Sequence, residues 1–103
     1  MKARSSVLPE VETARESSDW RWKARRVLSR FGHRAIPALV EALRRGEDPI
    51  IRGFAADSLG RLGSEARDAS EALRHAAWHD EDPLVREASA AALAAVEEAG
   101  PSQ

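Results

Sequence analysis

The chain contains no cysteine among its 103 residues. This absence excludes disulfides, thiolate catalysis and cysteine-ligated zinc or iron–sulfur sites, and it fits a reducing compartment. The N-terminal sequence MKARSSVLPEVE has no apolar segment of the signal-peptide type, and the most apolar run, at 88–96, is too short to span a bilayer. We therefore expect a cytoplasmic protein without a membrane-spanning segment.

Catalytic motifs are also missing from the sequence. It has no glycine-rich phosphate loop, no Ser/His/Asp set and no pair of carboxylates in an apolar setting. We expect no enzymatic activity and no cofactor.

The charge is nearly balanced overall, at −1, but it is unevenly distributed. Residues 19–62 hold ten basic and five acidic residues, a net charge of +5, whereas residues 63–103 hold three basic and nine acidic residues, a net charge of −6. Such an asymmetry can steer partners, or bring two copies together head to tail.

An internal repeat organises the chain. The segment DPIIRGFAADSLGRLG, from Asp48, recurs 34 residues later as DPLVREASAAALAAVE, from Asp82, with Arg52 in register with Arg86. DWRWKARRVLSRFG, at 19–32, is a third copy at a shift of 31. Between these copies lie AIPALVEALRR (35–45) and ARDASEALRHAAW (66–78), and VLPEVETARE (7–16) is a fainter segment of the same second kind.

Both kinds of segment have helical periodicity, with apolar residues at i, i+3, i+4 and i+7. Asp48 and Asp82 each precede a proline, which is typical of helix N-caps, and Gly32 and Gly63 follow the last apolar position, where a helix end favours a positive φ. We predict helices over 8–17, 19–31, 34–45, 49–62, 65–79 and 83–98, and no strands. They form one domain over 7–99, between a disordered tail at 1–6 and a short tail at 100–103.

The recurring pattern of Asp, Pro, aliphatic, Arg, Ala, Leu and Gly resembles HEAT repeats, in particular the short phycobilisome-lyase-type class, over about residues 8–98. The resemblance implies an all-α fold, a right-handed α-solenoid of about five to six antiparallel helices. It also implies a scaffold whose second helices line a concave, partner-binding surface, and an arginine in each repeat that ties to the Asp-led loop. Some relatives are di-iron hydroxylases with His-Glu pairs, but none of the three histidines here is followed by glutamate.

Outward-facing residues on the predicted helices are the candidates for partner binding. The two second-kind helices, at 34–45 and 65–79, would form one groove that is basic on one side and acidic and aromatic on the other. Trp22 would point outward beside two arginines. The alternatives are a solvated charged face, and Trp22 as a cap over the end of the array. The candidates are Trp22, Arg25, Arg26, Glu41, Arg44, Arg45, Glu71, Arg74, His75 and Trp78.

Two further features have a functional and a plain interpretation. Glu71, His75 and His79 are spaced i, i+4, i+8, which would suit a divalent metal, although a solvated polar face is the favoured interpretation and we expect no metal. The last helix is alanine-rich on every side, which predicts a docking surface for another copy or for further repeats of a partner. The alternative is that alanine serves helix propensity. That surface comprises Ala90, Ala91, Ala94 and Ala95.

The sequence thus predicts a small HEAT-like adaptor that holds a protein segment on its second-helix face. The main alternative is nucleic-acid binding through the basic first half, where no acid occurs between residues 20 and 40. A weaker alternative is an accessory chaperone or lyase-type subunit. The basic residues in question are Arg21, Lys23, Arg25, Arg26, Arg30 and Arg34.

Overall fold

The computed structural model describes residues 21–98, with side chains from residue 24 onward, so the predictions made for residues 1–20 and 99–103 lie outside the described residues. The described chain is helical and contains no strand, which confirms the all-α fold class. It comprises α2 (Arg21–Phe31), the 3-10 segment η3 (Gly32–Ala35), α3 (Ile36–Arg45), α4 (Pro49–Leu62), the 3-10 segment η4 (Gly63–Ala69), α5 (Ser70–His79) and α6 (Pro83–Glu98).

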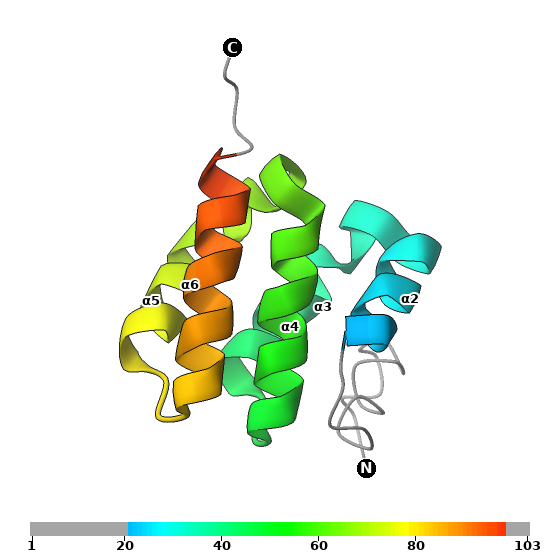
Figure 1. Ribbon diagram of the computed structural model, residues 1–103. Coiled ribbons are helices and arrows are strands. Elements are labelled where there is room, and N and C mark those ends of the chain that lie inside the picture. The colour runs from blue at the N-terminus through cyan, green and yellow to red at the C-terminus, as the bar shows by residue number, and fades with distance from the viewer. Residues whose placement is uncertain (1–20, 99–103) are drawn as a thin grey trace.

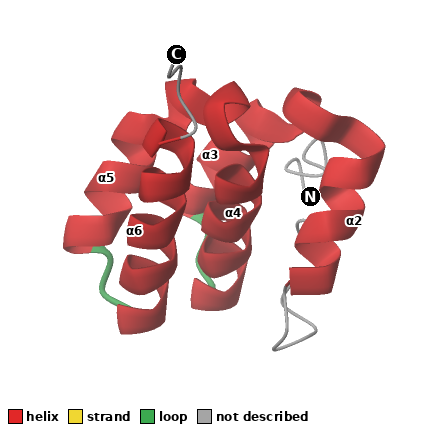
Figure 2. Ribbon diagram, turned by 45° about the horizontal axis from the view of Figure 1, so that its top comes forward, coloured by secondary structure: helices red, strands yellow, loops and turns green. Residues whose placement is uncertain are grey.

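The helices alternate between two layers. Helices α2, α4 and α6 lie side by side in one layer, and α3 and α5 lie behind them in the other (Figure 1 and Figure 2). Helix α4 packs against α2, α3 and α6, and α5 packs against α6. Successive helical pairs therefore stack on one another, as helical repeats do. The right-handed turn of the array and its total number of helices stay predictions.

Aspartates begin the two longest helices. The Asp48 side chain accepts a hydrogen bond from the backbone N–H of Ile50 at 2.8 Å, and the Asp82 side chain accepts one from Leu84 at 2.8 Å. A proline follows each aspartate, where its missing N–H costs nothing because the first helical amides have no intrahelical partner. Both predicted N-caps are confirmed.

Glycines end α2 and α4. Gly32 has a φ of +56° and Gly63 a φ of +60°, as the sequence pattern predicts. The chain then continues as 3-10 helix, so that α3 begins at Ile36 and α5 at Ser70, later than the predicted starts at 34 and 65. In η4 the buried residues Ala66 and Ala69 are three apart, which matches the period of a 3-10 helix rather than that of an α-helix.

The core lies between the two layers. Its largest fully buried apolar side chains are those of Phe54, Leu39, Leu59 and Leu73, and alanines fill much of the remainder. A core rich in alanine allows the helices to approach closely. The packing therefore fixes how α3 and α5 lie relative to each other, and that arrangement forms the candidate site.

Candidate functional site

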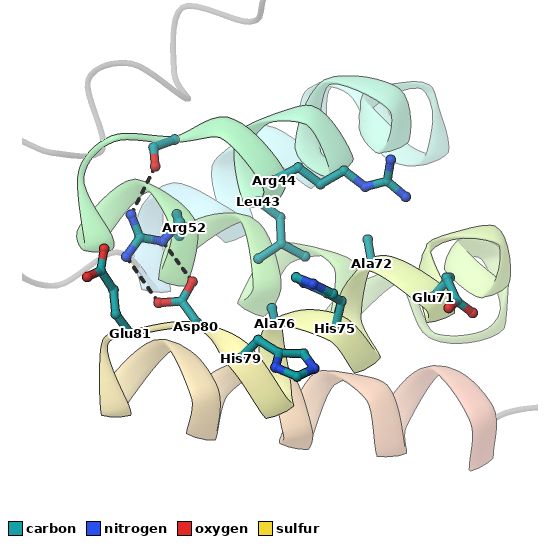
Figure 3. A pocket seen from close by; sticks show the side chains of 11 residues that line it. Leu43, Arg44, Arg52, Glu71, Ala72, His75, Ala76, His79, Asp80 and Glu81 are labelled. Carbon is teal, nitrogen blue, oxygen red and sulfur yellow. Dashed lines mark hydrogen bonds and ion pairs between the residues drawn. The ribbon is translucent and has the colours of Figure 1, made fainter.

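An open groove runs between α3 and α5, the two helices of the second layer. The cavity measures about 630 Å³ (Figure 3). Its apolar surface comes from Leu43 on α3 and from Ala72 and Ala76 on α5. We call it the α3–α5 groove. Because all three of these side chains are nearly or fully buried, the groove has a well-packed apolar floor rather than a mobile one.

Helix α5 presents two rows of residues to this groove. Ala72 and Ala76 form the inner row, and Glu71, His75 and His79 form the outer row. Each row has the i, i+4 spacing that places side chains one above another on a helix. The groove is therefore apolar at its base and polar along its α5 rim.

Arg52 and Asp80 close one end of the groove (Figure 3). Arg52 Nε donates to Asp80 Oδ2 at 2.8 Å, and Nη2 donates to Oδ1 at 3.0 Å. Arg52 Nη1 donates to the carbonyl oxygen of Gly46 at 2.9 Å. Only 11% of the Arg52 side chain and 8% of the Asp80 side chain is exposed. One arginine thus connects α4 to the loop after α3 and the loop after α5.

The environment of this ion pair shifts both groups toward their charged forms. Burial by itself would raise the pKa of Asp80, but hydrogen bonds from Arg52 and from the backbone N–H of Asp82 lower it below its ordinary value, and the charges of Arg52 and Arg86 add to that lowering. The hydrogen bond to Asp80 likewise raises the pKa of Arg52. The pair therefore stays ionised near neutral pH, which suits a structural clamp and not a proton donor or acceptor.

Part of this arrangement recurs in the next repeat. Arg86 Nη1 donates to the carbonyl oxygen of Asp80 at 2.7 Å, and Asp80 stands in register with Gly46. Arg52 and Arg86 therefore each bind the carbonyl group just after the preceding helix. This contact is the one that the family resemblance implies for Arg52 and Arg86.

The histidine pair is close, but it lacks further metal ligands. The rings of His75 and His79 have centroids 4.8 Å apart and planes inclined by 43°. Among residues 21–98, no three His, Asp or Glu side chains are grouped so that they could hold a metal ion. The structure therefore does not bring Glu71 in as a third ligand.

The predicted partner-binding residues separate into two groups. Arg44, Glu71 and His75 line the groove, whereas Arg74 and Trp78 are not among its lining residues, so their contact with a partner stays a prediction. Arg74 donates from Nη2 to Glu97 Oε2 on α6 at 2.8 Å, and Trp78, one helical turn along, is 75% exposed. The ion pair between Arg74 and Glu97 shows that this part of α5 is directed toward α6 and not toward α3.

The remaining candidates also lie apart from the groove. Glu41 and Arg45, which form a row of their own on α3, are exposed and do not line it, and Arg25 and Arg26 are exposed on α2. The side chain of Trp22 lies outside the described residues.

Sequence reasoning missed Asp80 and Glu81. A signal was available, because the 34-residue register aligns Asp80 with Gly46 and so marks a new acid within an otherwise matching turn. From this acid, and from its position next to the arginine of the preceding repeat, the ion pair between Arg52 and Asp80 could have been predicted.

The layers of helical pairs and the recurring arginine contact define a helical-repeat protein. The family model for HEAT repeats matches residues 7–94, and the chain belongs to this family. Neither a curated protein nor a solved structure shows significant similarity to it. HEAT repeats generally mediate protein–protein interactions and are typically scaffolds without catalytic activity. Within residues 21–98, every helix is too short or too polar to cross a membrane.

Proposed function

We propose that this protein is a small binding module that holds a protein segment in the α3–α5 groove. The observation that carries the proposal is the groove itself, a cavity of about 630 Å³ with an apolar floor between the two helices of the second layer. A site with an apolar base and a few charged groups at its edges is typical of protein recognition. The adaptor role, the concave shape of this face and a cytoplasmic location are parts of the same proposal.

The charges around the groove indicate what kind of segment fits. Arg52 and Asp80 neutralise each other, and Glu71 lies 3.5 Å from Arg74, so the charged groups most available to a partner are Arg44 and Glu81. Glu81 lies at the end closed by the Arg52–Asp80 pair, and Arg44 extends away from that end (Figure 3). A segment with an acidic residue against Arg44, a basic residue against Glu81 and a small aliphatic residue between them matches this order.

The groove can be tested without knowledge of the partner. A phage library of random short peptides is selected on the wild-type protein and then screened against Arg44→Glu and Arg45→Glu. The two arginines are neighbours on α3 and both are exposed, but only Arg44 lines the groove. We expect enriched peptides that carry Asp or Glu, that keep binding to Arg45→Glu and that lose at least about tenfold in affinity for Arg44→Glu.

Circular dichroism provides the control, because both variants should keep the helical spectrum of the wild type. Peptides that bind both variants equally well would place the binding site elsewhere on the protein. Selection that yields no peptide above the bare matrix would count against a peptide-binding groove altogether.

A further inference from the structure

Arg52 and Arg86 occupy equivalent positions in successive repeats, but Arg52 binds both a carbonyl group and a carboxylate, whereas Arg86 binds a carbonyl group alone. Arg52 uses Nη1 for the carbonyl group of Gly46, and Nε and Nη2 for the carboxylate of Asp80. Arg86 uses Nη1 in the same way, for the carbonyl group of Asp80. No other hydrogen bond or ion pair of Arg86 occurs in the described structure, so no carboxylate binds its Nε and Nη2 edge, although its charge still acts on Asp80.

The helix faces around the two arginines show the same difference. In α4, Gly53 and Ala56 are buried and share a face with Gly60, where an added Cβ would lie 2.9 Å from the Cα atom of Ala92 on α6. This face of α4 is therefore the one that α6 covers. In the register of 34 residues, Gly53 corresponds to Glu87 and Ala56 to Ala90, and both of these residues of α6 are exposed.

The same register separates the four alanines of α6. Ala94 corresponds to Gly60, so it belongs with Ala90 to the face that would meet a further unit. Ala91 and Ala95 instead correspond to Asp57 and Arg61, which form an ion pair of 3.0 Å on the outer surface of α4. The surface that matches a repeat interface is therefore narrower than the alanine pattern predicts, and we call it the end face of α6: Arg86, Glu87, Ala90 and Ala94.

We propose that the end face of α6 binds a helical hairpin of another protein, which packs on α6 as α6 packs on α4 and places a carboxylate on Nε and Nη2 of Arg86. The position of the carboxylate follows from the Arg52–Asp80 pair, because Arg86 is held by the same backbone contact as Arg52. A planar guanidinium group with two parallel free donors binds a carboxylate in a bidentate manner.

Charge decides which hairpin fits. Glu87 occupies the place of the buried Gly53, so the partner must bring a basic side chain to it, and small residues to Ala90 and Ala94. A second copy that packed its own α6 against this face would bring Glu87 close to acidic residues of the other α6, among them Glu97 and Glu98. This repulsion disfavours a symmetric dimer through α6, so we propose a different chain as the occupant and leave a head-to-tail copy as an outcome of the test.

The receptor property can be tested with a hairpin whose structure is known. The test protein consists of residues 1–96 followed by a second copy of residues 63–98, joined there because Val96 stands in register with Leu62. The second copy of Asp80 then has the same position relative to Arg86 that Asp80 itself has relative to Arg52. The probe is this appended copy. NMR hydrogen exchange at the Nε–H group of Arg86 is the readout. We expect exchange at least about tenfold slower than in the unextended chain, as befits a charge-assisted hydrogen bond.

Two variants make the result specific. Substituting asparagine for the aspartate of the appended copy alone should restore fast exchange at Arg86. Glu87→Gly should lower the Tm of the unextended chain, because glycine weakens an exposed helix, and raise the Tm of the extended chain, because it removes a buried unpaired charge. An appended copy that stays unfolded, or one that folds without slowing exchange at Arg86, would overturn the proposal.

Light scattering across a range of protein concentrations tests whether a second copy of this chain binds the end face of α6 instead. The unextended wild-type chain should show no dimer that depends on the end face. A dimer that dissociates with Ala90→Glu but persists with Ala91→Glu would show that a second copy binds there, and would replace the partner proposed above.

Discussion

Ser89 is fully buried in α6, and its hydroxyl group has no hydrogen-bond partner among the described residues. In the preceding repeat its position is held by Ala55, which is equally buried. An unsatisfied buried hydroxyl group destabilises the folded state. We expect Ser89→Ala to raise the free energy of unfolding by about 1–2 kcal/mol, measured by urea denaturation.

Ser58 is the matched control for this change. It is also fully buried, but its hydroxyl group donates to the carbonyl oxygen of Phe54 at 2.8 Å. Ser58→Ala removes a hydrogen bond that is made, so it should give no comparable gain. Equal stabilisation by both substitutions would mean that helix propensity, and not the unsatisfied hydroxyl group, is responsible.

Asp80 should make stability depend on pH in the acid range. Its pKa in the folded state is below the unfolded value, so its contribution is present above about pH 4 and is lost as pH falls through the folded pKa. We expect Asp80→Asn to cost about 2–4 kcal/mol at neutral pH, because it leaves the nearly buried Arg52 without its charged partner. The difference from wild type should shrink at about pH 3, which lies below the ordinary carboxyl pKa, because the unfolded chain then takes up a proton that the folded state resists.

Urea denaturation at the two pH values measures both quantities, and Asp57→Asn serves for comparison. Asp57 pairs with Arg61 at 3.0 Å, but both side chains are about a third exposed, so this variant should lose less than about 1 kcal/mol. A stability difference for Asp80→Asn that is the same at both pH values would contradict the clamp as the source of the pH dependence.

Among the helices, α4 and α6 come closer together than the size of most residues would permit. A methyl group at Gly60 would lie 2.9 Å from both the Cα and the Cβ atom of Ala92. We expect Gly60→Ala to destabilise the protein by about 1–3 kcal/mol in urea denaturation, although alanine is the better helix former, because α6 must move away from α4.

Arg61→Ala is the control for this prediction, since Arg61 is the next residue of α4 and is exposed. It should change the free energy of unfolding by less than about 1 kcal/mol. If Gly60→Ala were to stabilise the protein, helix propensity would outweigh the contact between α4 and α6, and the close approach of the two helices would have to be less rigid than their packing indicates.

The sequence was informative for elements in which several local signals agree. For α4 and α6, the aspartate caps, the prolines and the apolar period all indicate the same helix, and the repeat register adds a fourth argument. For α5 the period alone was available, and it does not reveal that the chain first passes through the 3-10 segment with Ala66 and Ala69. Agreement among independent local signals therefore decides how well an element can be predicted.

The candidate site was predictable only in part, for a reason of packing. Arg44, Glu71 and His75 were recognised because they lie on the outer sides of their helices. The pattern did not show that Trp78 lies outside the groove lining, because α5 has two neighbours, α3 and α6, and the period of one helix does not reveal which residues face which neighbour. The groove is a property of two helices, so its borders follow from their arrangement.

At the scale of the whole molecule, the remaining question concerns the basic first half. Arg25, Arg26 and Arg34 are exposed on α2 and η3, so they are accessible to a polyanion. Three phosphate contacts would give an affinity for single-stranded DNA that falls with a slope of about 2 in log K against log salt. The net charge of −1 adds long-range repulsion of any polyanion.

We therefore expect no binding of a fluorescein-labelled oligo-dT in fluorescence anisotropy at physiological salt, and only weak binding at low salt. The double variant Arg25→Glu, Arg26→Glu should abolish the low-salt binding, whereas Arg44→Glu, on the groove, should reduce it less. Tight binding at physiological salt that depends on Arg25 and Arg26 would favour nucleic acid over a protein segment as the partner. The exposed acidic residues of α6 lie on the opposite side of the layer from α2 (Figure 1). A polyanion bound at α2 would therefore be repelled wherever it extended toward α6. The α3–α5 groove has a positive group, Arg44, and a negative group, Glu81, within one site, so it suits a protein segment that carries both charges.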